Sequence, residues 1–237
     1  MTQIWAHRGA SAYAPENSIE AFALAEKMDA DGIELDVRLT ADGEVVVVHD
    51  HTLDRTTDRT GVVAELSLAE VQQAVIPGTN PSVIPTLAQV LDLVRPGRMQ
   101  INIELKHTAD LAPELARAAV GVIAASGLGE RVIVSSFNHW SLKTVQQHAP
   151  GTRVGLLLSD GIYVPWEYAA QFGAAAIHPH HQWLAVPGFV DYAHAAGVAV
   201  NVWTVNTGYE LRRALDVRVD AAITNHPDRG LMLRNRR

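Results

Sequence analysis

Apolar and polar positions follow one repeating pattern along the chain. A short apolar run is followed by a polar loop, and the loop by a longer stretch in which apolar residues recur every three or four positions. The first pattern is typical of a buried β-strand and the second of an amphipathic α-helix. We predict eight strands on this basis, at residues 3–7, 32–37, 100–106, 132–136, 153–158, 174–178, 198–205 and 221–224.

Capping boxes mark the expected starts of several helices. In this motif a Ser, Thr, Asp or Asn caps the first turn, and a Glu or Gln three residues later bonds back to the cap. The spacing occurs at Asn17 with Glu20, Ser67 with Glu70, Thr86 with Gln89, and Thr207 with Glu210. A longer helix is predicted near residues 110–125 from its 3.6-residue periodicity.

Eight strands that alternate with helices predict an α/β fold, the TIM (β/α)8 barrel. A length of 237 residues suits one such barrel, so we expect a single domain over residues 1–237. One segment interrupts the alternation of strands and helices, and we predict a small insertion there, after the second strand, at about residues 51–85. It either shapes substrate access over the active face or forms a solvated excursion, and both interpretations stay open at this point.

The segment 32–50 carries the most distinctive chemistry. Glu34 and Asp36 lie two positions apart in an apolar run, so in a strand both side chains point to the same face. A turn at Gly43 and four valines then predict a hairpin that ends at His49. Two buried acids need a cation or a base beside them. The alternative is a half-exposed edge strand with a solvated acidic face.

Composition and charge narrow the expected partners. The chain has 19 Lys and Arg against 26 Asp and Glu, a net charge of −7, which argues against nucleic acid or an anionic membrane surface. Without cysteine there is neither a disulfide nor a thiolate metal site. No apolar run can span a bilayer and no signal peptide precedes the first strand, so we expect a cytoplasmic protein without stable membrane insertion. A homo-oligomer is compatible with this composition.

Charged residues crowd the ends of the first three barrel strands, where this fold places its chemistry. Glu34 and Asp36 lie on the second strand, Glu104 and Lys106 on the third, and Arg8 follows the first. Three carboxylates suit a hard divalent cation such as Mg²⁺ or Ca²⁺. A dication would change the net charge of these five side chains from −1 to +1, which favours an anion such as a phosphodiester. The alternative is a buried cluster of ion pairs.

Two histidines and one tryptophan complete the candidate site. His7 and His49 are candidates for proton transfer, because imidazole titrates near neutral pH. Trp203 ends an apolar strand, where it either fills the core or stacks on the apolar part of a substrate. The tract around His178 and His180 is interpreted as a loop, with His178 lining the mouth of the barrel.

Several motifs, taken in order, resemble those of the glycerophosphodiester phosphodiesterases, and they cover nearly the whole chain. They are HRG at 7–9, PENS at 15–18, DGIELDVRLTADG at 31–43, VVVHD at 46–50, LDRTT at 53–57, IPTL at 84–87, IELK at 103–106 and WTVN at 203–206. That family's fold is a TIM barrel with a small insertion after the second strand. One departure is the PSV at 81–83, where the family often has acidic residues, and it bears on insertion geometry and substrate range.

The resemblance implies metal-dependent hydrolysis of a small glycerophosphodiester to glycerol 3-phosphate and an alcohol. The substrate's glycerol 2-hydroxyl would attack first, giving a cyclic phosphate that water opens. The implied roles are divalent metal binding by Glu34, Asp36 and Glu104, acid–base catalysis by His7 and His49, and phosphate contacts by Arg8 and Lys106. Two alternatives remain: a lysophospholipase D-type phosphodiesterase, and a non-catalytic phosphoester-binding barrel.

Overall fold

Eight parallel strands close into a barrel in the computed structural model, which describes residues 1–78, 82–106 and 112–236. In order around the barrel they are β1 (Gln3–His7), β2 (Gly32–Leu39), β6 (Gln100–Leu105), β7 (Val132–Ser136), β8 (Arg153–Leu158), β9 (Ala176–Pro179), β10 (Ala199–Val202) and β11 (Ala221–Thr224). Pairing of β1 with both β11 and β2 closes the sheet. The predicted TIM barrel is confirmed.

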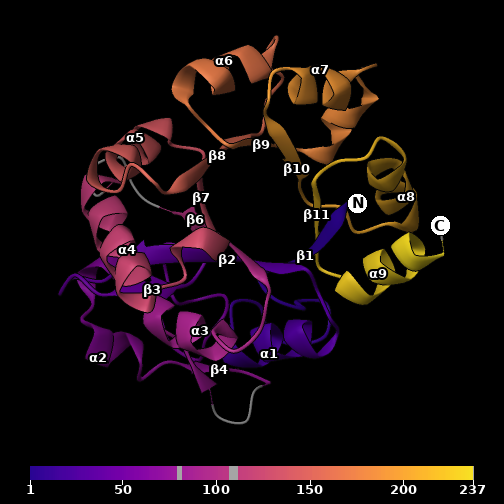
Figure 1. Ribbon diagram of the computed structural model, residues 1–237. Helices are drawn as coiled ribbons and strands as arrows, with labels where there is room; N and C mark the ends of the chain where they lie inside the picture. The colour runs from indigo at the N-terminus through magenta and orange to yellow at the C-terminus, as the bar shows by residue number, and fades with distance from the viewer. Residues whose placement is uncertain (79–81, 107–111, 237) are drawn as a thin grey trace.

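Helices surround the barrel as an outer ring (Figure 1). They are α1 (Ile19–Lys27), α3 (Leu87–Val94), α4 (Ala112–Ser126), α5 (His139–His148), α6 (Pro165–Phe172), α7 (Phe189–Ala195), α8 (Gly208–Asp216) and α9 (Pro227–Asn235). Short 3₁₀ turns, η3 (Gly129–Arg131) and η4 (His181–Ala185), precede β7 and α7. Within the described ranges, no helix combines the length and apolar character needed to cross a membrane.

The alternation of side chains along each strand divides the core in two. Outward-facing residues of β2, such as Ile33 and Leu35, join the main hydrophobic core together with helix residues such as Leu91. A smaller cluster that includes Trp5 and Ile133 comes from the opposite, inward faces of the strands. Glu34 and Asp36 alternate with the outward residues of β2, so their side chains point to the barrel interior.

Three of the four predicted capping boxes are present, at Ser67, Thr86 and Thr207. The prediction for Asn17 is wrong by one residue, because Ser18 caps α1 and its Oγ accepts a hydrogen bond from Ala21 N. Asn17 itself has a left-handed backbone, with φ of 58°. Its side chain is therefore free for another partner, described below.

Strand boundaries differ from prediction at two neighbouring strands, β9 and β10. β9 begins two residues later than expected, and β10 ends at Val202, so Trp203 joins its neighbour only through an isolated bridge to His180. His178 lies within β9 and is fully buried, as the predicted strand at 174–178 has it, so the loop interpretation of this tract does not hold for His178. The predicted longer helix corresponds to α4, and the first two residues of its expected range lie outside the described residues.

The segment between β2 and α3 leaves the barrel, as expected. The predicted hairpin partner is β3 (Val45–Val47), which pairs antiparallel with β2. After it come η1 (Val63–Glu65), α2 (Leu68–Val71), β4 (Val75–Ile76) and β5 (Ser82–Val83). They pack on one side of the barrel (Figure 1). Their side chains form a hydrophobic cluster of their own, so the interpretation of this segment as a solvated excursion is wrong. The cluster contains Val46, Val48, Leu53, Val63, Val71, Ala74, Ile76 and Ile84.

Gly155 on β8 provides a test of the packing inside the barrel. A Cβ at this position would lie 2.4 Å from Nε2 of buried His178, which also accepts a hydrogen bond from Asn201. Gly155→Ala should therefore lower the free energy of unfolding by about 1–3 kcal/mol. In the control, Gly121→Ala in α4, the new Cβ meets nothing within 4 Å and should raise it by about 0.5–1 kcal/mol. Urea unfolding measures both, and a Gly155→Ala variant as stable as the parent contradicts this packing.

Candidate active site

The three predicted metal ligands meet at the carboxyl ends of adjacent strands. Parallel pairing sets Asp36 of β2 opposite Glu104 of β6, and Glu34 of β2 opposite His7 of β1. One carboxylate oxygen from each of the three acids lies within 4.8 Å of the others. Asp36 is fully buried, while Glu34 and Glu104 are 3% and 8% exposed. The alternative of an edge strand with a solvated acidic face is wrong.

Two cationic side chains lie against this cluster. Arg8 Nε is 3.1 Å from Asp36 Oδ2, and Lys106 Nζ is 3.5 Å from Asp36 Oδ1 and 2.5 Å from Glu104 Oε1. These are the contacts that the ion-pair alternative expected. Within the described ranges, no ion pair joins Glu34 to a Lys or Arg side chain; its Oε2 accepts a hydrogen bond from the backbone N of Arg8 at 2.9 Å.

The pKa values of the three acids respond differently to this environment. Burial raises the pKa of Glu34 well above its usual value, and the charges of Asp36 and Glu104 add to the effect. Burial, with the charge of Asp36, raises the pKa of Glu104 to about 7. Burial acts in the same direction on Asp36, but Lys106 and Arg8 outweigh it and lower the pKa of Asp36. The two bases thus outweigh burial at Asp36 and offset it only in part at Glu34 and Glu104.

This donor set fits a hard divalent cation. Asp36 Oδ1 and Glu104 Oε1 are buried, and neither accepts a well-directed hydrogen bond from a described residue, although Lys106 lies close to both. The ligands on offer are all carboxylate oxygens, the type that Mg²⁺ and Ca²⁺ prefer. Two positive charges would offset the repulsion that raises the pKa values of Glu34 and Glu104.

The turn after β1 explains how Arg8 reaches the cluster. Arg8 and Gly9 both have a left-handed backbone, with φ of 55° and 79°. Such a conformation is strained for arginine, and glycine is required next to it, because a Cβ at Gly9 would lie 2.6 Å from the backbone of Ala21. The resulting sharp turn aims the Arg8 amide at Glu34 and its guanidinium at Asp36.

Asn17 makes a polar contact with Asp36 that the sequence analysis missed. Its Nδ2 donates to Asp36 Oδ2 at 2.9 Å, and its Oδ1 accepts from the backbone N of Asp36 at 3.3 Å. The paired bonds fix the carboxylate of Asp36 from inside the fold. The PENS motif pointed to this residue, but its place before an apolar stretch led to the interpretation as a helix cap.

His7 is held with one ring nitrogen toward the carboxylates. Nδ1 donates to Asn225 Oδ1 at 2.6 Å, and the backbone N of Asn225 donates to Asn206 Oδ1. Nε2 is 3.8 Å from Glu34 Oε2. Burial and the charge of Arg8 lower the pKa of His7 to about 4, so the ring is neutral near pH 7. Asn225 and Asn206 follow β11 and β10, and only their place at strand ends could have marked them.

His49 follows β3, next to Val48, whose backbone N donates to the carbonyl of Asp36 at 3.0 Å. Its Nδ1 is 2.6 Å from Asp50 Oδ1, and its carbonyl accepts a hydrogen bond from Arg38 Nε. Burial lowers the pKa of His49, while the nearby charge of Asp36 opposes this. Both predicted proton-transfer residues therefore adjoin the carboxylate cluster, and each has its Nδ1 engaged by another side chain.

Trp203 forms part of an aromatic wall next to Lys106. Its Nε1 donates to the carbonyl of His178 at 2.7 Å, which fixes the ring. Phe137, which the sequence analysis missed, meets Trp203 edge to face at 5.4 Å, and Lys106 Nζ lies 5.7 Å from the Phe137 ring. Phe137 is 44% exposed, so this wall offers an apolar surface beside the charged cluster.

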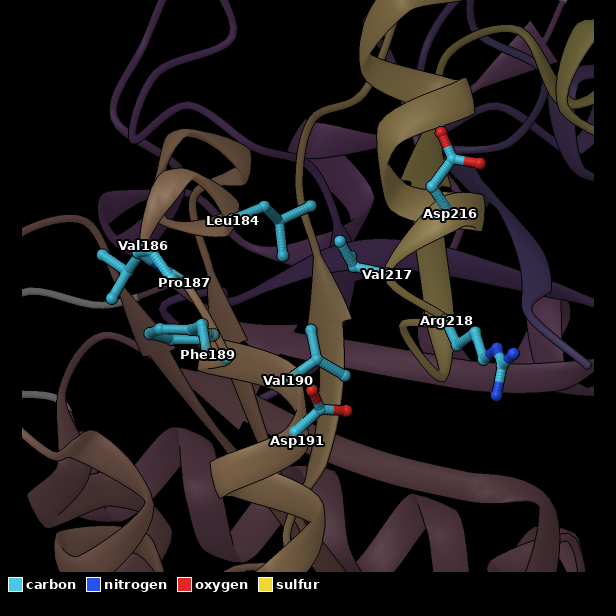
Figure 2. A pocket seen from close by; sticks show the side chains of 10 residues that line it. Leu184, Val186, Pro187, Phe189, Val190, Asp191, Asp216, Val217 and Arg218 are labelled. Atoms are coloured by element: carbon cyan, nitrogen blue, oxygen red, sulfur yellow. The ribbon is translucent and has the colours of Figure 1, made fainter.

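A separate pocket lies on the outer ring, between the start of α7 and the end of α8 (Figure 2). It contains none of the predicted site residues; its lining is Leu184, Val186, Pro187, Gly188, Phe189, Val190, Asp191, Asp216, Val217 and Arg218. The acids that could hold a metal ion therefore lie at the carboxylate cluster and not in this pocket.

Comparison with known proteins agrees with the motifs. The model of the glycerophosphoryl diester phosphodiesterase family matches residues 7–229. A glycerophosphodiester phosphodiesterase of Caldanaerobacter subterraneus subsp. tengcongensis is 39% identical over 235 residues, 96% of this chain and 95% of the relative. One from Bacillus altitudinis is 36% identical over 241 residues, 99% of this chain and 98% of the relative.

A solved structure extends this comparison. An Oleispira antarctica phosphodiesterase, in complex with the product sn-glycerol-3-phosphate, superposes with a TM-score of 0.89 at 28% identity, covering 98% of this chain and 96% of that one. The fold and the sequence thus agree over almost the full length, and the expected resemblance is confirmed. The chain belongs to the glycerophosphoryl diester phosphodiesterase family.

Proposed function

We propose that the chain hydrolyses glycerophosphodiesters to glycerol 3-phosphate and an alcohol. One observation supports this above all: three buried carboxylates share the barrel rim with two cationic side chains and two histidines. The named activity of the relatives and the product bound to the Oleispira antarctica neighbour support the same substrate class. The proposal includes one catalytic domain over residues 1–237, with the segment 51–85 as its insertion, and a cytoplasmic location.

In this proposal Glu34, Asp36 and Glu104 hold one Mg²⁺ or Ca²⁺ ion. When bound, such an ion polarises phosphoryl oxygens and makes a nearby hydroxyl more acidic. Arg8 and Lys106 supply further positive charge on two sides of Asp36, where they bind and orient the anionic phosphate. Asn17 keeps the Asp36 carboxylate in place throughout.

The two histidines move protons. One accepts the proton of the attacking glycerol 2-hydroxyl, and the other donates a proton to the departing alkoxide, leaving a cyclic phosphate. In the second step these roles reverse: one histidine deprotonates water, and the other returns a proton to the 2-oxygen as the ring opens. Because Nδ1 of His7 is bonded to Asn225, Nε2 is the atom that exchanges the proton.

The lysophospholipase D-type activity remains the second candidate, and the aromatic wall favours it. Phe137 and Trp203 offer an apolar surface beside Lys106, against which the acyl chain of a lysophospholipid would pack. Small head-group diesters need no such surface. The two candidates share the reaction and release the same head-group alcohol, and they differ in whether the glycerol carries an acyl chain, so one assay separates them.

Removal and return of the metal test the proposed reaction. Glycerophosphocholine and glycerophosphoethanolamine should release glycerol 3-phosphate, EDTA should stop the release, and Mg²⁺ or Ca²⁺ should restore it. Lysophosphatidylcholine serves as the parallel substrate, and faster turnover of it would favour the second candidate. Undiminished hydrolysis after exhaustive chelation would refute the metal requirement.

Metal binding also has a readout that does not depend on activity. An ion at 100 times its dissociation constant stabilises the folded state by about 2.7 kcal/mol, which is roughly 5–10 °C in melting temperature for a chain of this size. Glu104→Gln should abolish this shift, since it removes one ligand. Glu114→Gln, on an exposed part of α4, is the matched control and should keep it. Equal shifts in the two variants would place the ion elsewhere.

Replacement of the histidines tests the proton transfers. His7→Ala and His49→Ala should each lower kcat by about 10²–10⁴-fold with the melting temperature little changed, because general acid–base catalysis contributes on this scale. His148→Ala is the control, because this residue is exposed and its Nδ1 contacts the carbonyl of Thr144 in its own helix, so its loss should leave kcat unchanged. Parent-like rates in either of the first two variants would remove that histidine from the mechanism.

A further inference from the structure

The inserted segment brings one arginine to the edge of the active site. Residues 53–57 form the LDRTT motif, in which Leu53 is buried in the hydrophobic cluster of the insertion. Thr57 is buried as well, and its Oγ1 donates to the Leu53 carbonyl at 2.9 Å. These two anchors fix the turn between them, and Arg55 projects from it with half of its side chain exposed.

Arg55 binds two carboxylates at once, each through two contacts. Its Nε and Nη2 donate to Asp50 at 2.6 and 3.1 Å, and its Nη2 and Nη1 donate to Glu16 at 2.7 and 3.1 Å. Such bidentate contacts restrict the rotation of both carboxylates, which a single point charge does not. Arg55 therefore links the chain before α1 to the end of the hairpin.

Each of these two carboxylates also contacts a residue of the proposed mechanism. Asp50 Oδ1, which accepts from Arg55, is also 2.6 Å from His49 Nδ1. Glu16 Oε1, which accepts from Arg55, also accepts from Arg8 Nη1 at 3.0 Å. Arg55 itself is in contact with neither His49 nor Arg8, so it can act on them only through Asp50 and Glu16.

The contribution of these ion pairs to fold stability is too small to explain the arrangement. Ion pairs of half-exposed side chains contribute little to the free energy of unfolding, because water and salt screen them and the long side chains lose entropy. Four directed contacts on one arginine, ending at two active-site residues, restrict geometry far more than they stabilise the fold.

We propose that Arg55 is a positioning residue, which holds the carboxylates of Asp50 and Glu16 and through them orients the His49 imidazole and the Arg8 guanidinium. The proposal rests on the proposed function for the roles of His49 and Arg8. Loss of Arg55 frees Asp50 to rotate, which misplaces the ring of His49 and lowers kcat. It also frees Glu16 to rotate, which misplaces the Arg8 guanidinium that Glu16 holds, so the substrate phosphate binds less well and KM rises.

Steady-state kinetics with glycerophosphocholine at saturating Mg²⁺ test this. Arg55→Gln should lower kcat by about tenfold to a hundredfold, the scale of a misplaced catalytic group, and should raise KM severalfold. Arg55→Lys should recover only part of the loss, because an ammonium group cannot hold both carboxylates in the same geometry. The melting temperature should change little in either variant.

Two further variants separate the two branches. Asp50→Asn should reproduce mainly the loss in kcat, and Glu16→Gln mainly the change in KM. Arg59→Gln is the matched control: this arginine is exposed in the same segment, and no ion pair of its side chain is recorded within the described ranges. Its kcat and KM should equal those of the parent.

The outcomes distinguish the positioning role of Arg55 from the proposed function on which it rests. If Arg55→Gln keeps kcat and KM within twofold of the parent while His49→Ala is inactive, Arg55 does not position the site, and the proposed function stands. If the Arg55→Gln loss is accounted for by a smaller folded fraction, its role is structural and the proposal is overturned. If His49→Ala retains full activity, the proposed mechanism fails and the positioning role fails with it.

Discussion

Uncompensated negative charge at the end of the barrel is the constraint around which this structure is arranged. Glu34, Asp36 and Glu104 lie close together, because the register of the adjacent parallel strands fixes their backbone positions. Two bases oppose three acids, and both contact Asp36, while Lys106 also contacts Glu104. The opposite shifts in the pKa values of Asp36 and of its two neighbours follow from this unequal sharing. A site built in this way favours a further positive charge before any substrate arrives.

Uncharged side chains then determine where the charged groups point. Asn17 holds Asp36 from within the fold, and Asn225 holds His7 from the last strand of the barrel. A left-handed turn aims Arg8 at two of the acids. These contacts come from segments far apart in the sequence, and barrel closure brings them together because β1 lies between β2 and β11. The site is thus a product of the closed sheet.

The sequence predicted what depends on local pattern, and it missed what depends on contacts between distant segments. Periodicity located every barrel strand, and the alternation along β2 placed Glu34 and Asp36 on one face. The capping rule failed at Asn17, because a buried carboxylate offers this amide better partners than a helix end does. Phe137 carried no local signal, and Asn225 had only its place at a strand end, since the importance of both arises from neighbours on other strands. The bond from Trp203, just past the end of β10, to the carbonyl of His178 is likewise a contact between strands that no local pattern predicts.

The separate hydrophobic cluster of the inserted segment has a consequence for how such barrels diversify. Its apolar residues pack with one another and with the hairpin, so mutations there need no matching changes beneath the outer helices. A segment of this kind can change its length or surface while the catalytic rim keeps its shape. A different substrate can then be accommodated by changes in this segment, which reaches the rim through the contacts of Arg55 with Asp50 and Glu16.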